Sequence, residues 1–183
     1  MNQDSLDVAL DEARQGEEVG VAALFRAFNP GLVRYLRHHA LGVEEDLASE
    51  VWAAAATLLP DFEGDAHAFR ALLFTLARRR TIDHYRRSGR ALAVVELNEI
   101  HEPADRADLE TAVVSNLSAQ EAIEALVKGL PTTQAEVILL RVVGDLSVDE
   151  VAKILGRSPG SVRVLQHRAV QRLAKKFKEV VTP

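Results

Sequence analysis

The stretch Leu146–Leu173, LSVDEVAKILGRSPGSVRVLQHRAVQRL, carries the most specific structural signals in the chain. Ser147 and Glu150 have the spacing of a capping box, in which each side chain accepts a hydrogen bond from the other residue's backbone N–H at the start of a helix. Gly156 tolerates the left-handed conformation that ends a helix, and Ser158, followed by a proline, can begin the next one. Two helices joined by a short turn that contains glycine predict a helix-turn-helix.

The second helix of this pair lies in a basic segment without carboxylates. From Val151 to Lys178 there are eight Lys or Arg residues and no Asp or Glu, although the 183-residue chain is acidic, with 22 Lys+Arg against 27 Asp+Glu. The second helix of a helix-turn-helix enters the major groove of DNA, where the phosphates would repel a carboxylate. We therefore predict that this helix reads duplex DNA. The side chains expected at the contact are Arg157, Ser158, Ser161, Arg163, Val164 and Arg168.

A second basic segment covers Phe69–Arg90 and has seven arginines against one acid, Asp83. Together the two segments hold 15 of the 22 basic residues of the chain. A single cationic run is often only a solvated helix face. Two such runs on an acidic chain favour two contacts with a polyanion, most simply a nucleic acid.

Apolar residues recur at helical spacing almost throughout the chain, which predicts helices rather than strands. A helix over Val21–Ala40 is expected to break or kink at Asn29–Gly31, because proline interrupts helices. A capping box of Ser118 with Glu121 predicts another helix start. The remaining helices are expected at Glu44–Leu59, Ala66–Ser88 and Thr132–Val143. The expected core residues of the helix over 66–88 are Leu72, Leu73, Leu76 and Ile82.

Residues 91–117 differ from both flanks, because they are acidic, contain a proline and show weak periodicity. We therefore predict an all-α protein with two small helical domains, 1–90 and 118–183, joined by the acidic linker 91–117.

Several functional classes lack the residues that they would need. The chain has no Cys, and its six His residues form no strong metal-ligand spacing such as H-E-x-x-H. It also has no G-x-S-x-G or P-loop motif. These observations argue against an enzyme and predict neither a metal nor another cofactor. The acidic N-terminus is no signal peptide, and no apolar run is long enough to cross a membrane, so a cytoplasmic location is expected.

The segment from Leu130, LPTTQAEVILLRVVGDLSVDEVAKILGRSPGSVRVLQHRA, resembles region 4 of the bacterial sigma-70 family, in particular its extracytoplasmic-function (ECF) subfamily. The resemblance implies that the helix-turn-helix binds the −35 promoter element. Two upstream segments, EEDLASEVWAAAATLLPDFEG from Glu44 and FRALLFTLARRRTIDHYRR from Phe69, resemble region 2 of the same family. Departures from the family pattern occur at Ser49, Leu72 and Arg79.

The region 2 resemblance assigns two further sets of residues. It implies that the loop Pro60–Ala66 and the following basic helix engage the −10 element, with Phe62 able either to stack on a base or to fill the helical core. The expected −10 residues are Phe62, Arg78, Arg79, Arg80, Asp83, Arg86 and Arg87. The acidic helix beginning at Glu44 is implied to dock on the clamp coiled coil of the largest RNA polymerase subunit. The residues expected at that contact are Asp46, Leu47 and Glu50.

The function implied by the resemblance is that of an ECF sigma factor, which binds core RNA polymerase and directs promoter recognition, promoter opening and transcription initiation. The implied partners are core polymerase, at its clamp coiled coil and flap, promoter DNA and an anti-sigma factor. The alternative is a one-component helix-turn-helix regulator that does not dock on polymerase. Such a regulator would need only the C-terminal domain and would bind its operator unaided.

Overall fold

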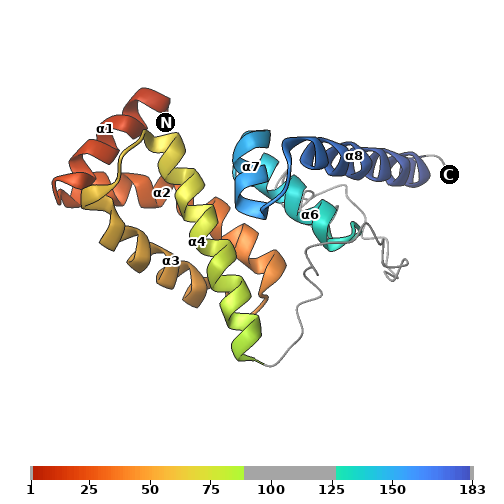
Figure 1. Cartoon of the computed structure of the whole chain (residues 1–183), viewed down its shortest axis with the longest axis horizontal. Helices are drawn as coiled ribbons and strands as arrows, with labels where there is room; N and C mark the ends of the chain where they lie inside the picture. The colour runs from red at the N-terminus through yellow and green to blue at the C-terminus, as the bar shows by residue number, and fades with distance from the viewer. Residues whose placement is uncertain (1, 89–126, 182–183) are drawn as a thin grey trace. The chain divides into compact units, whose positions relative to one another are not determined.

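The computed structural model describes residues 2–88 and 127–181, with side chains up to 175. Within these ranges every regular element is a helix (Figure 1), which confirms the all-α prediction. The helices belong to two compact units, an N-terminal one built from α1 to α4 and a C-terminal one built from α6 to α8. The predicted linker 91–117 and the capping box at Ser118 lie outside the described residues.

The N-terminal unit packs four helices around one apolar core. They are α1 (Gln3–Arg14), α2 (Glu18–His39), α3 (Glu44–Leu58) and α4 (Ala66–Arg87), with a short 3-10 helix η1 (Leu59–Asp61) after α3. Helix α2 packs against α1, α3 and α4, and α3 also packs against α4. The largest fully buried side chains include Leu10, Leu24, Tyr35, Phe69 and Phe74.

Helix α2 runs without interruption from Glu18 to His39 and contains Pro30. The predicted break at this position is therefore wrong, and a kink there stays a prediction. Proline removes the hydrogen bond to the carbonyl four residues earlier, that of Arg26. Arg26 and Pro30 are both exposed, so water can hydrogen-bond to this carbonyl. The opposite side of α2 buries Leu24, Phe28 and other apolar residues, and this packing holds the helix together despite the proline.

The face of α4 that enters the core differs from the predicted one. Besides Ala66 at its start, the buried side chains of α4 are Phe69, Leu73, Phe74, Ala77 and Thr81. Of the four predicted core residues only Leu73 is buried, whereas Leu72, Leu76 and Ile82 are half-buried. The apolar content of α4 is spread around the helix, and the aromatic rings of Phe69 and Phe74 decide which face turns inward, because they bury the largest area.

Helix α1 was not predicted, although the sequence contains its signals. Leu6, Ala9, Leu10 and Ala13 follow one helical face and are buried, as the i, i+3, i+4, i+7 spacing requires. The Asn2 side chain caps the helix by accepting a hydrogen bond from the Ser5 N–H at 3.1 Å. The acidic residues between the apolar positions concealed the pattern.

The C-terminal unit contains α6 (Thr132–Ile138), α7 (Val148–Leu155) and α8 (Pro159–Val181). The π-helical segment η3 (Leu139–Val143) follows α6, and its last residue belongs to the N-terminal unit. Helices α6 and α7 both pack against α8. The contact buries Val162 and Ala169 of α8 completely, and Val151 and Leu155 of α7 are also buried. These residues form the inner faces of the helix pair.

The turn between α7 and α8 has the predicted geometry. The capping box is complete, with the Ser147 N–H donating to Glu150 Oε2 at 2.7 Å and the Glu150 N–H donating to Ser147 Oγ at 3.2 Å. Gly156 ends α7 in the left-handed conformation, with φ 64° and ψ 36°. The Ser158 hydroxyl accepts from the Ser161 N–H at 3.2 Å at the start of α8. These caps fix the angle at which α8 leaves the turn.

Candidate nucleic-acid and protein interfaces

The N-terminal half of α8 presents the predicted DNA-reading residues together on its outer side. Ser158, Ser161, Arg163, Val164 and Arg168 are exposed, and Arg157 is half-buried. They oppose the inner residues that pack against α6 and α7. The set therefore forms one continuous surface, which we call the α8 surface.

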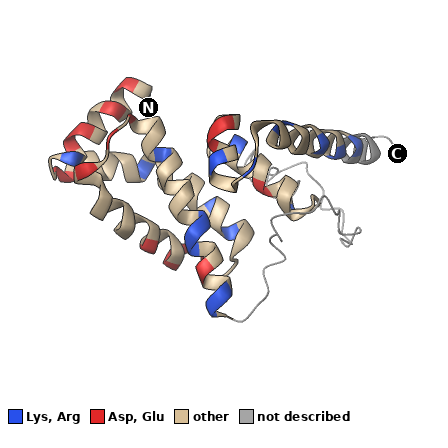
Figure 2. Ribbon diagram, viewed as in Figure 1, with Lys and Arg blue, Asp and Glu red and all other residues tan. Residues whose placement is uncertain are grey.

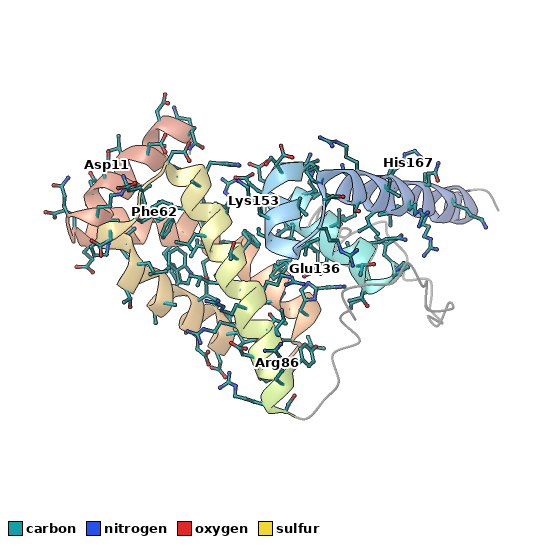
Figure 3. All side chains as sticks on the ribbon, viewed as in Figure 1. Asp11, Phe62, Arg86, Glu136, Lys153 and His167 are labelled. Carbon is teal, nitrogen blue, oxygen red and sulfur yellow. The ribbon has the colours of Figure 1, made fainter. Side chains whose placement is uncertain are left out.

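The cations of the α8 surface are available to a ligand. Within the described ranges, neither Arg163 nor Arg168 forms an ion pair with a carboxylate. Figure 2 shows Lys and Arg along α8 and no acidic residue on the part of the helix that it colours. His167, labelled in Figure 3, is also exposed on this helix. Val164 is 50% exposed, and an exposed aliphatic side chain among cations can meet the methyl group of thymine.

The arginines of α4 occupy its C-terminal half but differ in their surroundings. Arg79, Arg86 and Arg87 are exposed, whereas Arg78 and Arg80 are half-buried. The Arg87 Nε donates to the backbone carbonyl of Asp83, one turn earlier, at 3.4 Å. The exposed three form the outward cationic surface of this unit, which we call the α4 surface.

Two members of the predicted −10 set have partners inside the N-terminal unit. Arg80 Nε lies 3.7 Å from Glu50 Oε2 of α3, and both side chains are partly exposed, at 36% and 43%. Arg78 lies near the imidazole of His39, and its positive charge helps to lower the pKa of that histidine. The α4 arginines therefore form two groups. One group faces solvent, and the other, Arg78 and Arg80, interacts with neighbouring helices of the unit.

His39 ends α2 in a buried site. Burial, followed by the positive charges of His38 and Arg78, lowers the pKa of His39 to about 3. Its ring lies 4.6 Å from that of Tyr35 between centroids, and its backbone carbonyl accepts from the Tyr85 hydroxyl of α4. The imidazole is therefore neutral at physiological pH, because its charged form would be desolvated.

Phe62 lies at the opposite end of α4, in the loop between η1 and α4 (Figure 3). Its ring is half-buried and packs edge-on against Phe69 with centroids 5.5 Å apart. The Arg14 guanidinium lies over it at 5.7 Å from its centroid. The ring thus touches the core on one side and a cation of α1 on the other.

The structure does not bring Phe62 together with the α4 surface. At 1.5 Å per helical residue, Ala66 is about 20 Å from Arg79 and about 30 Å from Arg86 along the axis. B-form DNA rises about 3.4 Å per base pair, so this length matches about six to nine base pairs. The two groups are therefore too far apart to form one pocket.

The acidic edge of α3 contains two of the three residues predicted to bind polymerase. Asp46 and Glu50 are exposed one turn apart, as side chains four residues apart on a helix must be. Leu47 is only 2% exposed and packs inside the unit. Its assignment to a direct contact is therefore corrected, because a side chain in the core can support α3 but cannot touch a partner.

The start of α3 is fixed by Glu44. The Arg37 Nε donates to Glu44 Oε1 at 3.1 Å, and the Gly42 N–H donates to Oε2 at 2.6 Å. Hydrogen bonds from its own backbone N–H, from Arg37 and from Gly42 lower the pKa of Glu44. This carboxylate is therefore held at the start of α3 by groups of its own unit, whereas Asp46 and Glu50 are exposed.

Sequence reasoning missed two residues of α1 that hold the loop of Phe62. Arg14 donates to the backbone carbonyls of Phe62 and Gly64, and Asp7 accepts from the backbone N–H of Ala66. They were missed because their roles depend on a helix that was not predicted. The apolar spacing of α1 could have revealed that helix, but not its partner.

Metal-binding clusters and membrane-spanning helices are both absent from the described part of the chain. No cluster of three or more His, Cys, Asp or Glu side chains suited to a metal occurs among those residues. None of the described helices combines the length and the apolar content that spanning a bilayer requires.

Comparison with known proteins identifies both units. The family model for sigma-70 region 2 matches residues 24–91, and that for sigma-70 region 4 matches residues 120–173. Helix α1 therefore lies before the region 2 match, and the region 4 match covers α7, the turn and α8 up to Leu173.

Curated relatives match almost the full chain. The ECF RNA polymerase sigma factor SigD of Mycobacterium tuberculosis is 33% identical over 180 residues, covering 94% of this chain and 84% of the relative. The ECF RNA polymerase sigma factor ShbA of Streptomyces griseus is 33% identical over 171 residues, covering 88% and 89%.

A solved structure supports the fold. The sigma factor RpoE of Bartonella quintana, solved in complex with the anti-sigma factor NepR, matches with a TM-score of 0.60 and 23% identity, covering 87% of this chain and 96% of that chain.

Proposed function

This chain belongs to the ECF family of RNA polymerase sigma factors, and from that premise we propose how its surfaces divide the work of transcription initiation. The acidic edge of α3 binds core RNA polymerase, the α4 surface and the loop of Phe62 engage the −10 element, and the α8 surface reads the −35 element. The chain then acts as a bridge between polymerase and promoter, in the cytoplasm, without catalysing a reaction itself.

The observation that carries the proposal is the α8 surface. It is a capped, exposed helix face with Arg163 and Arg168 unpaired among the described residues, on a sequence segment without carboxylates. Arg can bind guanine edges bidentately, and Ser and Arg can bind phosphates. Arg157, Ser158 and Ser161, at the start of α8, are then the residues closest to the base edges, because helix-turn-helix proteins insert that end of the helix.

For the −10 element we propose two separate contacts. Arg79, Arg86 and Arg87 bind the phosphate backbone, whose charge they match. Arg78, Arg80 and Asp83, which are half-buried, shape the helix behind them. The loop of Phe62, at the other end of α4, receives an unpaired base, since single-stranded bases are held by stacking and by contacts to their edges.

For core polymerase we propose that Asp46 and Glu50 pair with cations of the clamp coiled coil. The C-terminal unit, which carries the α8 surface, is then the part that reaches the flap. A protein inhibitor is a further proposed partner, by analogy with RpoE of Bartonella quintana, which was solved with the anti-sigma factor NepR.

Reconstituted transcription tests this function. Core polymerase is incubated with genomic fragments in the presence and absence of the chain, and the transcript starts are mapped. Specific starts that require the chain are expected. Tight binding of the chain alone to a duplex, without any dependent start, would instead indicate a one-component regulator.

A further inference from the structure

Helix α1 makes an unusual set of contacts with the loop that precedes α4. Three groups of the loop backbone, at alternating residues, are each bound by a side chain of α1. The Arg14 Nε donates to the Phe62 carbonyl at 3.0 Å, and its Nη2 donates to the Gly64 carbonyl at 2.5 Å. Asp7 Oδ1 accepts from the Ala66 N–H at 2.7 Å.

The Arg14 guanidinium is itself held in place. Its Nη1 donates to Asp11 Oδ1 of the same helix at 2.7 Å, so each of its three nitrogens has a defined partner. Its Cζ also lies over the Phe62 ring, 5.7 Å from the centroid, which adds a cation–π contact. A lysine could not reproduce this arrangement, because an ammonium group lacks the planar fork that reaches two carbonyls at once.

These contacts determine what the loop exposes. Phe62 and Ala66 turn toward the unit, whereas the side chains of Asp61, Glu63 and Asp65 are exposed. Gly64 completes the path with φ 143°, and a Cβ atom there would lie 3.0 Å from Ala68 Cβ and 3.2 Å from Phe62 Cζ. The loop backbone is therefore bound by α1, and at Gly64 it passes close to Ala68 of α4.

We propose that α1 is a brace for this loop, with Arg14 and Asp7 as positioning residues that hold its backbone in the shape that receives an unpaired −10 base. The inference rests on the proposed function of the loop. A preorganised site binds its ligand without first ordering its own backbone, so the brace increases the difference in affinity between a correct and an incorrect base.

The first test measures the brace without DNA. Asp7→Ala removes the acceptor of the Ala66 N–H, whereas Asp7→Asn retains a carbonyl oxygen at the same place. Amide hydrogen exchange of the full chain should be faster at Ala66 by on the order of tenfold in Asp7→Ala and close to wild type in Asp7→Asn. Equal exchange in both variants and the wild type would overturn the brace.

The second test measures base selection. Holoenzymes with wild-type chain, Arg14→Lys or the matched control Arg26→Lys, an exposed arginine of α2, are titrated with forked promoters that carry matched or altered −10 bases. Arg14→Lys should reduce the matched-to-altered affinity ratio by on the order of tenfold, with unchanged affinity for core polymerase and for the −35 duplex. Arg26→Lys should retain the ratio.

The outcomes distinguish a failure of the α1 brace from a failure of the proposed sigma-factor function. A wild-type chain that opens promoters, together with an Arg14→Lys variant that selects bases equally well, contradicts the brace alone. A parallel loss of core binding, −35 binding and base selection in Arg14→Lys also contradicts it, because the residue would then stabilise only the fold. A wild-type chain that opens no promoter contradicts the proposed function itself.

Discussion

The two basic helices, α4 and α8, look alike in sequence but differ in how their charges are used. On α8 the cations lie on the exposed face, and the opposite face packs against α6 and α7. Among the described residues, no carboxylate pairs with Arg163 or Arg168. On α4, Arg80 pairs with Glu50 of α3 and Arg78 lies near the buried His39. A basic run in a sequence therefore marks either an open surface or a surface that is also part of the scaffold.

The difference has a functional consequence. The α8 surface can be changed without disturbing its own core, so substitutions there should affect DNA binding alone. The α4 surface adjoins the acidic edge of α3 through the Arg80–Glu50 pair, so substitutions there should affect two functions together. The following experiments test this contrast.

The largest effect is expected from Arg163→Glu on the α8 surface. Replacing a cation by an anion beside phosphates should weaken −35 duplex binding by holoenzyme by about 100-fold or more at low salt, because it removes one attraction and adds one repulsion. Fluorescence anisotropy at two salt concentrations measures the change. Arg26→Glu, an exposed charge reversal in the other unit, should leave −35 binding near the wild-type value.

The next effect concerns the buried end of α2. His39 has a pKa of 6.5 when unfolded and about 3 when folded, so between these values the unfolded state binds more protons. Its contribution to stability is complete above pH 6.5 and should decrease by about 1.4 kcal/mol per pH unit below it. Urea unfolding at pH 7 and pH 5 measures this slope.

His39→Phe provides the control for that slope, since it keeps an aromatic ring beside Tyr35 and cannot titrate. Between pH 7 and pH 5 the free energy of unfolding of the variant should decrease less than that of the wild type. The slopes should differ by up to about 1.4 kcal/mol per pH unit, which corresponds to one bound proton. Identical slopes for the two proteins would show that His39 is solvated in the native state and that the site is not as closed as the structure indicates.

A smaller effect is expected at the turn of the helix-turn-helix. Gly156→Ala places a Cβ at φ 64°, a conformation that costs about 1 kcal/mol or more for residues other than glycine. Gly160→Ala is the matched control, because Gly160 lies inside α8 with its nearest outside atom at 3.9 Å; it should be neutral or slightly stabilising. Thermal unfolding distinguishes the two, and equal effects would contradict the role of the cap.

The smallest effect is expected from Glu50→Gln. A partly exposed ion pair contributes about 0–1 kcal/mol, so the fold should be nearly unchanged. Releasing Arg80 should strengthen −10 DNA binding slightly, while the loss of a carboxylate should weaken core binding slightly. Opposite shifts in the two affinities support the shared use of this pair, and shifts of the same sign would contradict it.

Local chemistry explains which features could be predicted from the sequence. The helix-turn-helix was predictable because its caps, Gly156 and the Ser147–Glu150 box, determine structure within a few residues. The continuity of α2 through Pro30 was not, since it depends on which face of the helix is buried. The burial of Leu47 depends likewise on how α3 packs against its neighbours.

The loop of Phe62 shows the same limit at the candidate site. The start of α4 is fixed locally, because the Ala68 N–H donates to Asp65 Oδ1 at 2.7 Å. The contacts from Arg14 and Asp7 come from residues about 50 positions earlier, as the separations of 48 and 59 residues for two of these bonds record. No local pattern could have paired them.

The most direct test of the division of roles crosses two variants with two assays. Arg163→Glu and Asp46→Lys are each measured for core polymerase binding and, at saturating core, for −35 duplex binding. The account predicts that Arg163→Glu loses duplex binding and keeps core binding, and that Asp46→Lys does the reverse. Loss of both activities in either variant would contradict the assignment of cations to DNA and carboxylates to a protein partner.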